Sequence, residues 1–591
     1  MSEISRRSLL LGATAGAAVA AVGPGLTGAA QAAPRGGAPT VGPGDLRFTP
    51  GRTLRPGSAA QVGLRTEVVS AMVPDTARYL ATTAENPQHP MYAGATVIAA
   101  KDGVVVEYAA VGDAVRYALS GDSVVELPAA QRIPARTDTM WDLASMSKLF
   151  TATSVAQFIE RGRVELTAPV VRYLPDFAAN GKSDITVRHL LTHTSGLIPD
   201  PVPSLWAGYT TYAERVAAIL ATTPSAPPDT AYVYSDLNFL TLGLLVEAVS
   251  GQRLDAYVRE HVTAPLGLTD TMYTPPASLK PRIAAQEYEP WAGRGLVWGE
   301  VHDENAWALG GVAGHAGVFS TARDIAVFAQ TYLNGGRYGK ARILAEDTVR
   351  LMLHDHTSAL FPDDPHGLGW ELGLNWYMGA LASPVTFGHT GYTGTSIVVD
   401  PLAGSFVVLL TNRVHPSRDW GSNNIARRAV ADDLGLAVPV RPISRSAWYT
   451  RTDHATSTLT APLAAPTRTA TLDFALWYDT EPRADTVALS VSADGDLFTS
   501  LPFRLSGGGY DWTTDGTVTG YGGRRWLAGR AALPAGTRAV RWTYRTDVNS
   551  QGRGVYVDTV RVRDDRGVVF DSTRDGDEAR ISAIGWTRAD G

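Results

Sequence analysis

The spacing of hydrophobic residues changes near residue 440, and this change limits what the chain can fold into. Before Val438–Ile443, several stretches place apolar residues at helical spacing, whereas beyond it they alternate with polar residues over short runs. Alternating runs separated by Gly and Asp turns are typical of a β-sandwich. The 591 residues also exceed what one compact core holds. We therefore predict two domains, with Pro439 and Pro442 keeping the linker between them extended.

The first of these domains is predicted to be α+β. Residues 95–112 are apolar around Asp102-Gly103, which is a two-residue hairpin signal. Helical spacing follows at 146–162 and recurs later in the domain, and strands are predicted again near its end. Strands at both ends with helices between them indicate one antiparallel sheet flanked by helices, plus a helical subdomain. The later helices are predicted at 187–191, 240–249 and 325–333, and the later strands at 385–387, 395–400 and 405–411.

A Ser and a Lys three residues apart open the 146–162 stretch, in Ser145-Met146-Ser147-Lys148. Residues at this spacing share one face of a helix, where an amine can accept the proton of a hydroxyl and create a nucleophile. The chain contains only five lysines, and Arg cannot replace Lys in this role because it does not lose its proton near neutral pH. The simpler interpretation is a helix cap with a solvated Lys, so the tetrapeptide needs support from the rest of the chain.

Three further segments supply that support. They are Tyr234-Ser235-Asp236-Leu237-Asn238, Phe387-Gly388-His389-Thr390-Gly391-Tyr392, and the run from Ile185 to Leu197 that contains Thr192-His193-Thr194-Ser195-Gly196. With Ser-x-x-Lys they resemble the serine β-lactamase and penicillin-binding-protein superfamily, nearest its class C and D-Ala-D-Ala carboxypeptidase branch. The resemblance covers about Gln61 to Ala437 and implies a β-lactamase/transpeptidase-like fold.

The resemblance also implies roles for individual residues. Ser145 would be the acylated nucleophile at a helix N-terminus, and Lys148, held deprotonated by burial or hydrogen bonds, would accept its proton. Tyr234 would share the base role and protonate the leaving group. The backbone N–H groups of Ser145 and Tyr392 would form the oxyanion hole. The substrate-binding residues would be Asp236, His389, Thr390, Gly391 and His315.

Two positions depart from the family pattern. Asp236 stands where the family has Asn, and a carboxylate there would favour a charged Lys148. His389 stands where the family often has Lys, so a mostly neutral imidazole replaces the cation that helps bind a substrate carboxylate. We therefore expect that strong penicillinase activity is absent.

A fourth segment, Val301-His302-Asp303-Glu304-Asn305-Ala306 followed by the Gly-rich 310–317, is similar to β-lactamase-related hydrolases, some of which act on muropeptides as amidases. His302, Asp303 and His315 form a candidate metal set. We favour a loop that shapes the cleft, because no His-x-x-x-His pair accompanies them and the serine mechanism requires no metal. We predict no cofactor and no metal.

The second domain resembles jelly-roll modules appended to secreted hydrolases. Its acidic residues Asp479, Glu481, Asp494 and Asp558 are candidate Ca²⁺ ligands, although solvated turn acids are the interpretation we favour. Exposed Trp would hold a glycan, but alternating Trp more often belongs to a core.

Composition and the N-terminus narrow the setting. A net charge of −6 argues against a nucleic-acid partner, and the absence of Cys excludes thiol chemistry and Cys-bound metals. Arg6-Arg7, a mildly apolar stretch to about Val22 and Ala30-Gln31-Ala32 predict a twin-arginine export signal, with an uncleaved membrane anchor as the alternative.

The predicted organisation is a signal peptide at 1–33, a flexible leader at 34–57, a β-lactamase-like serine hydrolase domain at 58–437, a linker at 438–446 and a β-sandwich at 447–591. The predicted function is an exported, secreted or cell-envelope serine hydrolase acting on an ester or amide of a small peptide, muropeptide or ester. Two alternatives stay open: an acyl or peptidyl transferase with the same site, and a slow-turnover sensor whose sandwich binds a wall polymer.

Overall fold

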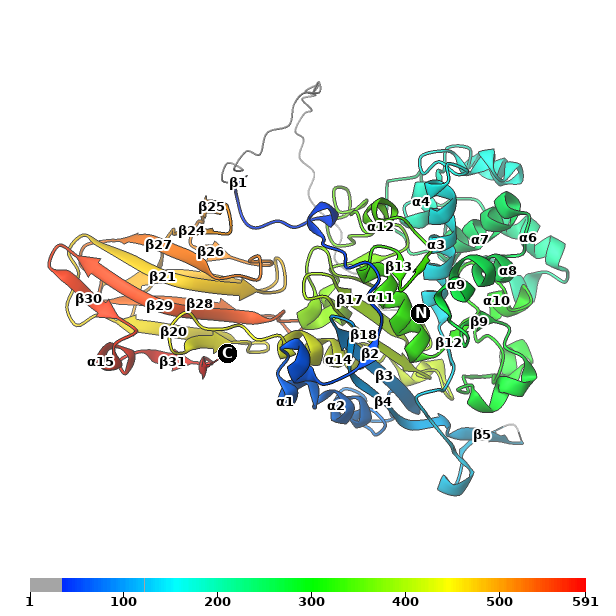
Figure 1. Cartoon of the computed structure of the whole chain (residues 1–591), viewed down its shortest axis with the longest axis horizontal. Coiled ribbons are helices and arrows are strands. Elements are labelled where there is room, and N and C mark those ends of the chain that lie inside the picture. Colours follow the sequence, from blue (N-terminus) through cyan, green and yellow to red (C-terminus); the bar gives the residue numbers. More distant parts are fainter. Residues whose placement is uncertain (1–34, 122, 591) are drawn as a thin grey trace.

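The computed structural model describes residues 35–121 and 123–590, which form two bodies joined end to end (Figure 1). A mixed helix and sheet domain lies on the right of that view and an all-β domain on the left. The export signal predicted at 1–33 lies outside the described residues. Within them, no helix combines the length and the apolar character that crossing a membrane requires.

The mixed domain is built on an eight-stranded, mainly antiparallel sheet. Its order is β15-β16-β17-β18-β3-β4-β2, with β7 also paired to β4, and only β2 pairs in parallel. The last strand of the sheet, β18, pairs at its centre with the early strand β3 over seven residues. The strands are β2 Arg55–Pro56, β3 Gly94–Lys101, β4 Val104–Val115, β7 Ile133–Pro134, β15 Glu371–Leu372, β16 Phe387–Thr390, β17 Ser396–Asp400 and β18 Ser405–Thr411.

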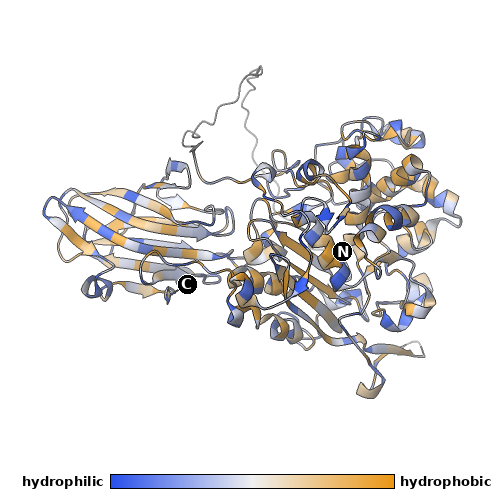
Figure 2. Cartoon of the chain, in the orientation of Figure 1, coloured by the Kyte–Doolittle hydropathy of each residue, from blue (hydrophilic) through white to orange (hydrophobic). Residues whose placement is uncertain are grey.

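Helices cover both faces of this sheet. One face packs against α1 (Thr66–Val69), α2 (Met72–Arg78) and α14 (Asn424–Ala437), and the other against α11 (Ala322–Leu333). Every residue of β18 is therefore buried, and the central strands are mostly orange in Figure 2. Continuous apolar strands of this kind belong to sheets that are covered on both sides.

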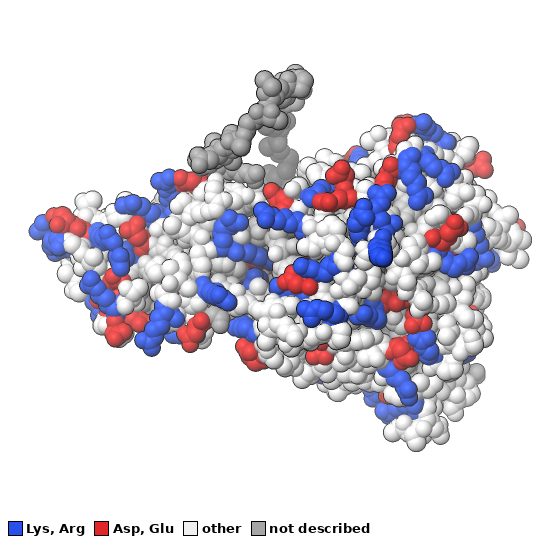
Figure 3. All heavy atoms as spheres, viewed as in Figure 1, with Lys and Arg blue, Asp and Glu red and all other residues white. Residues whose placement is uncertain are grey.

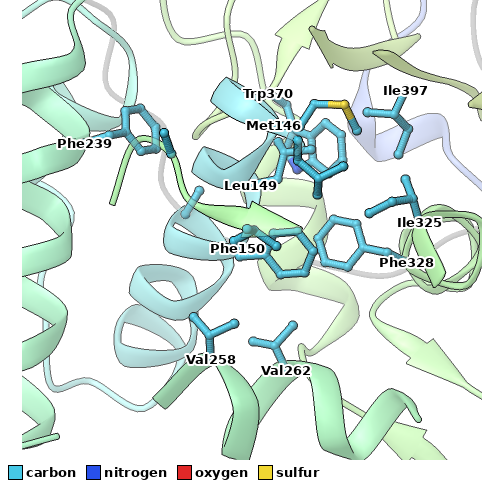
Figure 4. Packing of buried hydrophobic residues seen from close by; sticks show 14 of the residues in the cluster. Met146, Leu149, Phe150, Phe239, Val258, Val262, Ile325, Phe328, Trp370 and Ile397 are labelled. Atoms are coloured by element: carbon cyan, nitrogen blue, oxygen red, sulfur yellow. The ribbon is translucent and has the colours of Figure 1, made fainter. Parts of the chain in front are cut away.

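A helical region extends from the covered sheet and surrounds α3 (Lys148–Glu160). Eleven residues of α3 are buried, so this helix is packed on nearly all sides. Figure 4 shows the contact between Phe150 of α3 and Phe328 of α11, whose ring centroids are 4.9 Å apart. The neighbouring helices include α4 Val187–Leu191, α6 Tyr212–Ala221, α7 Asp236–Ser250, α8 Leu254–Val258 and α10 Glu304–Ala308.

The all-β domain is a sandwich of two antiparallel sheets around one core. Its strands alternate between buried and exposed residues, most regularly in β27 (Leu527–Leu533), and Figure 2 shows this alternation as changing colour along the strands. One sheet has the order β25-β24-β27-β21-β29-β19-β32 and the other β23-β22-β28-β20-β31. Besides β27, these strands are β19 Ala447–Thr450, β20 Thr456–Pro462, β21 Ala470–Asp479, β22 Thr486–Ser492, β23 Thr499–Ser500, β24 Arg504–Gly507, β25 Tyr510–Thr513, β28 Ala539–Arg545, β29 Gly554–Asp564, β31 Ser582–Ile584 and β32 Thr587–Ala589.

These findings confirm the predicted fold class and most of its elements. Asp102 and Gly103 have positive φ values of 53° and 77°, as a two-residue hairpin turn requires, and they join β3 to β4. The helix predicted at 187–191 is α4. The strand expected at 385–387 begins later, at Phe387, and extends through Thr390, which places His389 inside the strand.

Arg524 of the sandwich is the most deeply buried of the arginines that pair with the mixed domain, and Arg451 also pairs with Asp432 of α14 at 2.7 Å. Arg524 forms ion pairs with Asp479 of the sandwich at 2.9 Å and with Asp400 of β17 at 2.5 Å. It also donates hydrogen bonds of 2.9 Å to the carbonyls of Leu381 and Ala382 in the mixed domain. All three charged side chains are largely removed from water, so the pairing is costly to break on one side only.

The predicted leader contacts both domains over its described part. Leu46 and Leu54 are buried in the core of the mixed domain, and Arg350 donates to the Leu46 carbonyl at 2.9 Å. At its other end, β1 (Arg35–Gly36) pairs with β25 (Tyr510–Thr513) of the sandwich. The dark blue trace in Figure 1 follows this path from one domain to the other.

We expect Arg524→Met to weaken the docking of the domains, because it leaves Asp400 and Asp479 buried without a cation. Breaking a buried pair on one side costs on the order of 3–5 kcal/mol. Calorimetry should show a lower or split unfolding transition, with faster proteolysis of the linker at 438–446. Arg530→Met is the matched control, because the Arg530 side chain is 68% exposed and its ion pair with Asp473 is long, at 3.6 Å. An equal effect of the two variants would contradict the prediction.

Candidate active site

Ser145 lies in a single helical turn, Ala144–Ser147, that leads directly into α3. The turn begins with Ala144 at a φ of 47°, a left-handed conformation that is uncommon for a residue with a side chain. Asp142 holds it there, because its Oδ1 accepts a 2.9 Å hydrogen bond from the Ala144 amide. The nucleophile predicted from sequence is therefore carried by a constrained turn between strand β8 (Trp141–Asp142) and a buried helix.

Lys148 connects Ser145 to Asp236. Its Nζ lies 2.9 Å from Ser145 Oγ and 2.6 Å from Asp236 Oδ1, and its side chain is 0% exposed. Asp236 is the first residue of α7, so the contact joins two helices whose sequences are far apart. The carbonyl of His315 lies 3.5 Å from the same amine. Three of the residues proposed for one site are thus brought together around the Lys148 amine.

The charge of Lys148 differs from one sequence expectation and agrees with another. Burial disfavours the charged amine, but the negative charge of Asp236 outweighs burial and raises the pKa of Lys148. The deprotonated Lys148 expected from burial is therefore not the resting form. The structure instead favours the charged form that the Asp236 substitution suggested.

Tyr234 lies beside the same two groups. Its ring centroid is 4.8 Å from Lys148 Nζ. Burial raises the pKa of Tyr234 to about 12, although the charge of Lys148 and the polar groups of Lys148 and Ser145 act in the other direction. The phenol is accordingly neutral at rest and lies beside both partners that the family resemblance assigns to it.

His193, which the motif analysis left without a role, supports the Tyr234 ring at a centroid distance of 4.4 Å. Its Nδ1 accepts hydrogen bonds from the Ser235 amide and from Asn238, both at 3.1 Å. Burial, together with nearby positive charges, lowers the pKa of His193 well below its usual value. The imidazole is therefore neutral. Asn238, two residues beyond the motif position that Asp236 occupies, holds the His193 ring through this hydrogen bond.

Strand β16 forms the opposite side of the site. His389 is buried in it, and its Nδ1 lies 2.7 Å from the Thr390 carbonyl. Burial first, and then the charge of Lys148, lowers the pKa of His389 to about 3. The imidazole is neutral at pH 7, as the sequence analysis expected, and it supplies no cation.

Glycine at 391 allows β16 to reach the nucleophile turn. A Cβ on this residue would lie 2.3 Å from the Leu143 carbonyl and 2.1 Å from Thr395 Oγ1, so no larger residue fits without movement. Thr393 and Thr395 donate to the carbonyls of Asp142 and Leu143, at 2.7 and 3.0 Å. The Gly391–Tyr392 segment therefore runs beside the turn that carries Ser145, as an oxyanion hole requires.

Two arginines that the sequence analysis missed hold this segment from behind. Arg427 of α14 donates to the Gly391 carbonyl at 2.5 Å, and Arg413 donates to the Tyr392 carbonyl at 2.7 Å. Both side chains are almost fully buried. No local motif marks them, because their contact with β16 depends on the packing of α14 and of the loop after β18.

The candidate metal set divides between two places. His315 Nε2 lies 2.9 Å from Asp303 Oδ1, next to Asp236. Burial lowers the pKa of His315, but the negative charge of Asp303 outweighs burial, so the pKa is raised overall. His302 instead contacts Glu287 at 2.8 Å and Glu289 at 3.5 Å. The cation in contact with Asp236 is Lys148 itself, and the three residues do not form one ligand set.

The four candidate Ca²⁺ ligands of the sandwich are also separated. Asp479 pairs with Arg524, Asp558 accepts from the amides of Ile443 and Ser444, and Asp494 bonds within its own turn. Glu481 alone lies in an acidic group, with two residues that the sequence analysis did not name, Asp485 and Asp547. Asp479 and Asp558 are also buried, so they are not the solvated turn acids that we favoured.

Comparison with known proteins identifies the family of the mixed domain. The Beta-lactamase family matches residues 81–432. A protein of Escherichia coli (strain K12) named "Putative D-alanyl-D-alanine carboxypeptidase" is 35% identical over 353 residues, covering 55% of this chain and 79% of that protein. Its namesake in Salmonella agona (strain SL483) is 33% identical with the same coverage. A crystal structure of a penicillin-binding protein homolog from Caulobacter crescentus is 21% identical, covers 64% of this chain and 99% of its own, and has a TM-score of 0.49.

We expect Asp236→Asn to lower the pKa of Lys148, because burial then acts without the opposing carboxylate. If charged Lys148 is the active form, the basic limb of the kcat/KM profile for an ester moves to lower pH. Asp176→Asn, at an exposed carboxylate elsewhere, should leave the profile unchanged. Higher activity of Asp236→Asn at neutral pH would instead identify neutral Lys148 as the base and contradict the assignment.

Proposed function

The chain belongs to the Beta-lactamase family, and from that premise we propose that it is an exported serine hydrolase acting through an acyl-enzyme on a small peptide, muropeptide or ester. The observation that carries the proposal is the position of Lys148 Nζ, 2.9 Å from Ser145 Oγ and 2.6 Å from Asp236. The carboxylate of Asp236 already balances the charge of buried Lys148. Stability of the fold therefore does not explain why Ser145 Oγ also lies within hydrogen-bond distance of the amine. The names of the relatives favour a peptide that ends in a D-amino acid as the substrate.

In the proposed reaction Ser145 Oγ bonds to the substrate carbonyl carbon. Its proton passes to the Tyr234 oxygen, which gives its own hydrogen to the departing amine or alkoxide, so that Tyr234 ends neutral as it began. Charged Lys148 stabilises the negative charge that develops on both oxygens. Water then enters by the reverse of this proton transfer and releases the acid. Tyr234 thus takes the proton-acceptor role that the resemblance divided between it and Lys148.

The proposed oxyanion hole consists of the backbone N–H groups of Ser145 and Tyr392. The hydrogen bonds from Thr393 and Thr395 to the Asp142 and Leu143 carbonyls, just before the Ser145 turn, support this assignment, because they fix the distance between the two chain segments. Donors that are already in place need no reorganisation during the reaction, and losing one costs about 3 kcal/mol of barrier.

The loop at 199–209 adds an acidic group near Asp236 and Asp303. Asp200, in the loop at 199–209, has its pKa raised to about 6 by burial and by the negative charges of Asp236 and Asp303.

We propose that export follows the twin-arginine route and that the sandwich contacts a wall polymer. Both proposals rest on the sequence of the N-terminus and on the appended all-β domain.

We expect Ser145→Ala to abolish turnover of a panel of muropeptides, D-Ala-D-Ala peptides and esters, and to abolish labelling by a fluorophosphonate probe. Ser147→Ala is the matched control: Ser147 lies in the same turn, and its Oγ accepts only a structural hydrogen bond from the Val318 amide. The control should retain labelling. Full labelling of Ser145→Ala would remove the nucleophile from the proposal.

We expect weak turnover of nitrocefin, because neutral His389 supplies no cation for its carboxylate. Hydrogen bonds to charged groups contribute about 1.5–3 kcal/mol, so their loss lowers kcat/KM by roughly 10- to 100-fold. Steady-state kinetics of nitrocefin beside an ester tests this. A kcat/KM for nitrocefin near the diffusion limit of about 10⁸ M⁻¹s⁻¹ would contradict it.

A further inference from the structure

A cavity of about 560 Å³ lies where the two domains meet. Its walls come from the hairpin after β17, from the linker, and from the sandwich residues around Trp477 and Trp526. The volume falls within the roughly 300–1,000 Å³ of small-molecule sites, and domain junctions are common places for such sites. The cavity is separate from Ser145 and its partners, so the proposed reaction does not explain it.

The cavity has more positive charge than its carboxylates balance. Four arginines line it: Arg441, Arg524, Arg525 and Arg553. Arg524 is paired with Asp400 and Asp479. Among the residues that the structure describes, no carboxylate lies within 4.0 Å of the other three guanidinium groups. Over the face drawn in Figure 3, by contrast, charges of both signs intermingle across the domains.

Arg553 differs from an ordinary surface arginine because its guanidinium is buried at the wall of this cavity. It is only 6% exposed, it donates to the carbonyl of Val438 in the linker, and its guanidinium lies 5.1 Å from the Trp477 ring centroid. Burial first, and then the charge of Arg524, lowers the pKa of Arg553 to about 10. The charges of Asp479 and Asp400 act against this lowering, but neither carboxylate lies within 4.0 Å of the Arg553 guanidinium, so an anion in direct contact with it would be stabilising.

Aromatic groups in the same cavity are held in place. Trp526 Nε1 donates to the Arg441 carbonyl at 2.8 Å, which ties the ring to the linker. Indole rings bind the apolar faces of sugars, and guanidinium groups bind phosphate and carboxylate with two parallel hydrogen bonds. The cavity therefore combines a surface for a sugar ring with donors for its negative charge.

We propose that the cavity at the domain junction binds an anionic saccharide, with Arg441, Arg525 and Arg553 contacting its phosphate or carboxylate. A ligand here touches both domains and the linker, so binding also stabilises their docking. The site would hold the hydrolase on an anionic polymer while Ser145 remains free to react.

The test measures binding to the full chain carrying Ser145→Ala, so that it is independent of the proposed hydrolysis. Glucose 6-phosphate and glucuronate distinguish a phosphate source from a carboxylate source, and glucose is the neutral control. We expect at least one of the two anions to bind by calorimetry and to raise the unfolding temperature, and glucose to do neither. If neither anion binds, or if glucose binds equally well, the proposal is wrong.

The variants locate the site. Arg441→Gln combined with Arg525→Gln should raise Kd by about tenfold or more, since charge-assisted contacts are the strong ones. Arg530→Gln combined with Arg538→Gln removes the same charge at exposed positions of the sandwich and should leave Kd unchanged. Equal affinities of the two double variants would show that general attraction, and not this cavity, binds the anion.

A second inference concerns the site at Ser145 and rests on the proposed function. The Gly391 carbonyl, which accepts from buried Arg427 at 2.5 Å, belongs to the same peptide unit as the Tyr392 N–H. This peptide is trans, so its carbonyl and its N–H point in opposite directions. The Arg427 charge therefore lies at one end of the peptide dipole and the proposed oxyanion position at the other.

We infer that Arg427 is a positioning residue that orients and polarises the Tyr392 N–H toward the oxyanion. Its other nitrogen, Nη1, donates to Asn424 Oδ1 at 2.6 Å, which fixes the guanidinium on α14. Removing the Arg427 charge weakens the Tyr392 N–H as a hydrogen-bond donor to the oxyanion of the transition state. Binding of the ground-state substrate is affected less.

Arg427→Met should lower kcat by about 10- to 100-fold with little change in KM, which is less than the loss of a whole oxyanion donor. Affinity for a phosphonate transition-state analogue should fall in parallel, whereas affinity for the product should not. Arg427→Lys should recover part of both losses. If product and analogue weaken equally, or if Lys restores nothing, the role is structural only. Activity that survives Ser145→Ala would instead overturn the proposed function.

Discussion

The contact between the Lys148 amine and the Asp236 carboxylate is the interaction on which the site depends. It joins the helix that carries Ser145 to the helix that begins just after Tyr234. Both helices are buried, so neither charge would be stable there without the other. The pairing places the amine within hydrogen-bond distance of Ser145 and keeps it charged, which leaves the neutral phenol of Tyr234 as the group that moves protons.

Close backbone contacts make this arrangement possible. Gly391 lets β16 approach the nucleophile turn, and Gly314 plays the same part on the other side. A Cβ on Gly314 would lie 1.9 Å from the Phe239 carbonyl of α7, and its own carbonyl accepts from Thr151 of α3 at 2.7 Å. The Gly-rich segment at 310–317 therefore packs between the two helices of the site, where it fixes the position of His315. Its composition reflects this lack of space.

The two domains share more than a linker. Arg524 binds carboxylates of both, the leader segment contacts both, and the junction encloses a cavity with excess positive charge. An interface with a buried charge bridge restricts relative motion more than an extended linker alone would. The sandwich is consequently placed at a fixed position beside the hydrolase domain, on the opposite edge of the sheet domain from the helices around Ser145 (Figure 1).

The sequence by itself determined the local features. Apolar spacing located α4, the β3–β4 hairpin and the alternating strands of the sandwich, because each depends on neighbours within a few residues. The order of the motifs identified Ser145, Lys148 and Tyr234 as one group, and the structure brings them together. Tertiary structure decided what no local pattern encodes: that Asp236 keeps Lys148 charged, that His302 and His315 lie in different clusters, and that Arg427 lies behind Gly391. These properties arise from contacts between segments far apart in the chain, where burial and neighbouring charge set protonation and partners, and neither is visible in residue spacing.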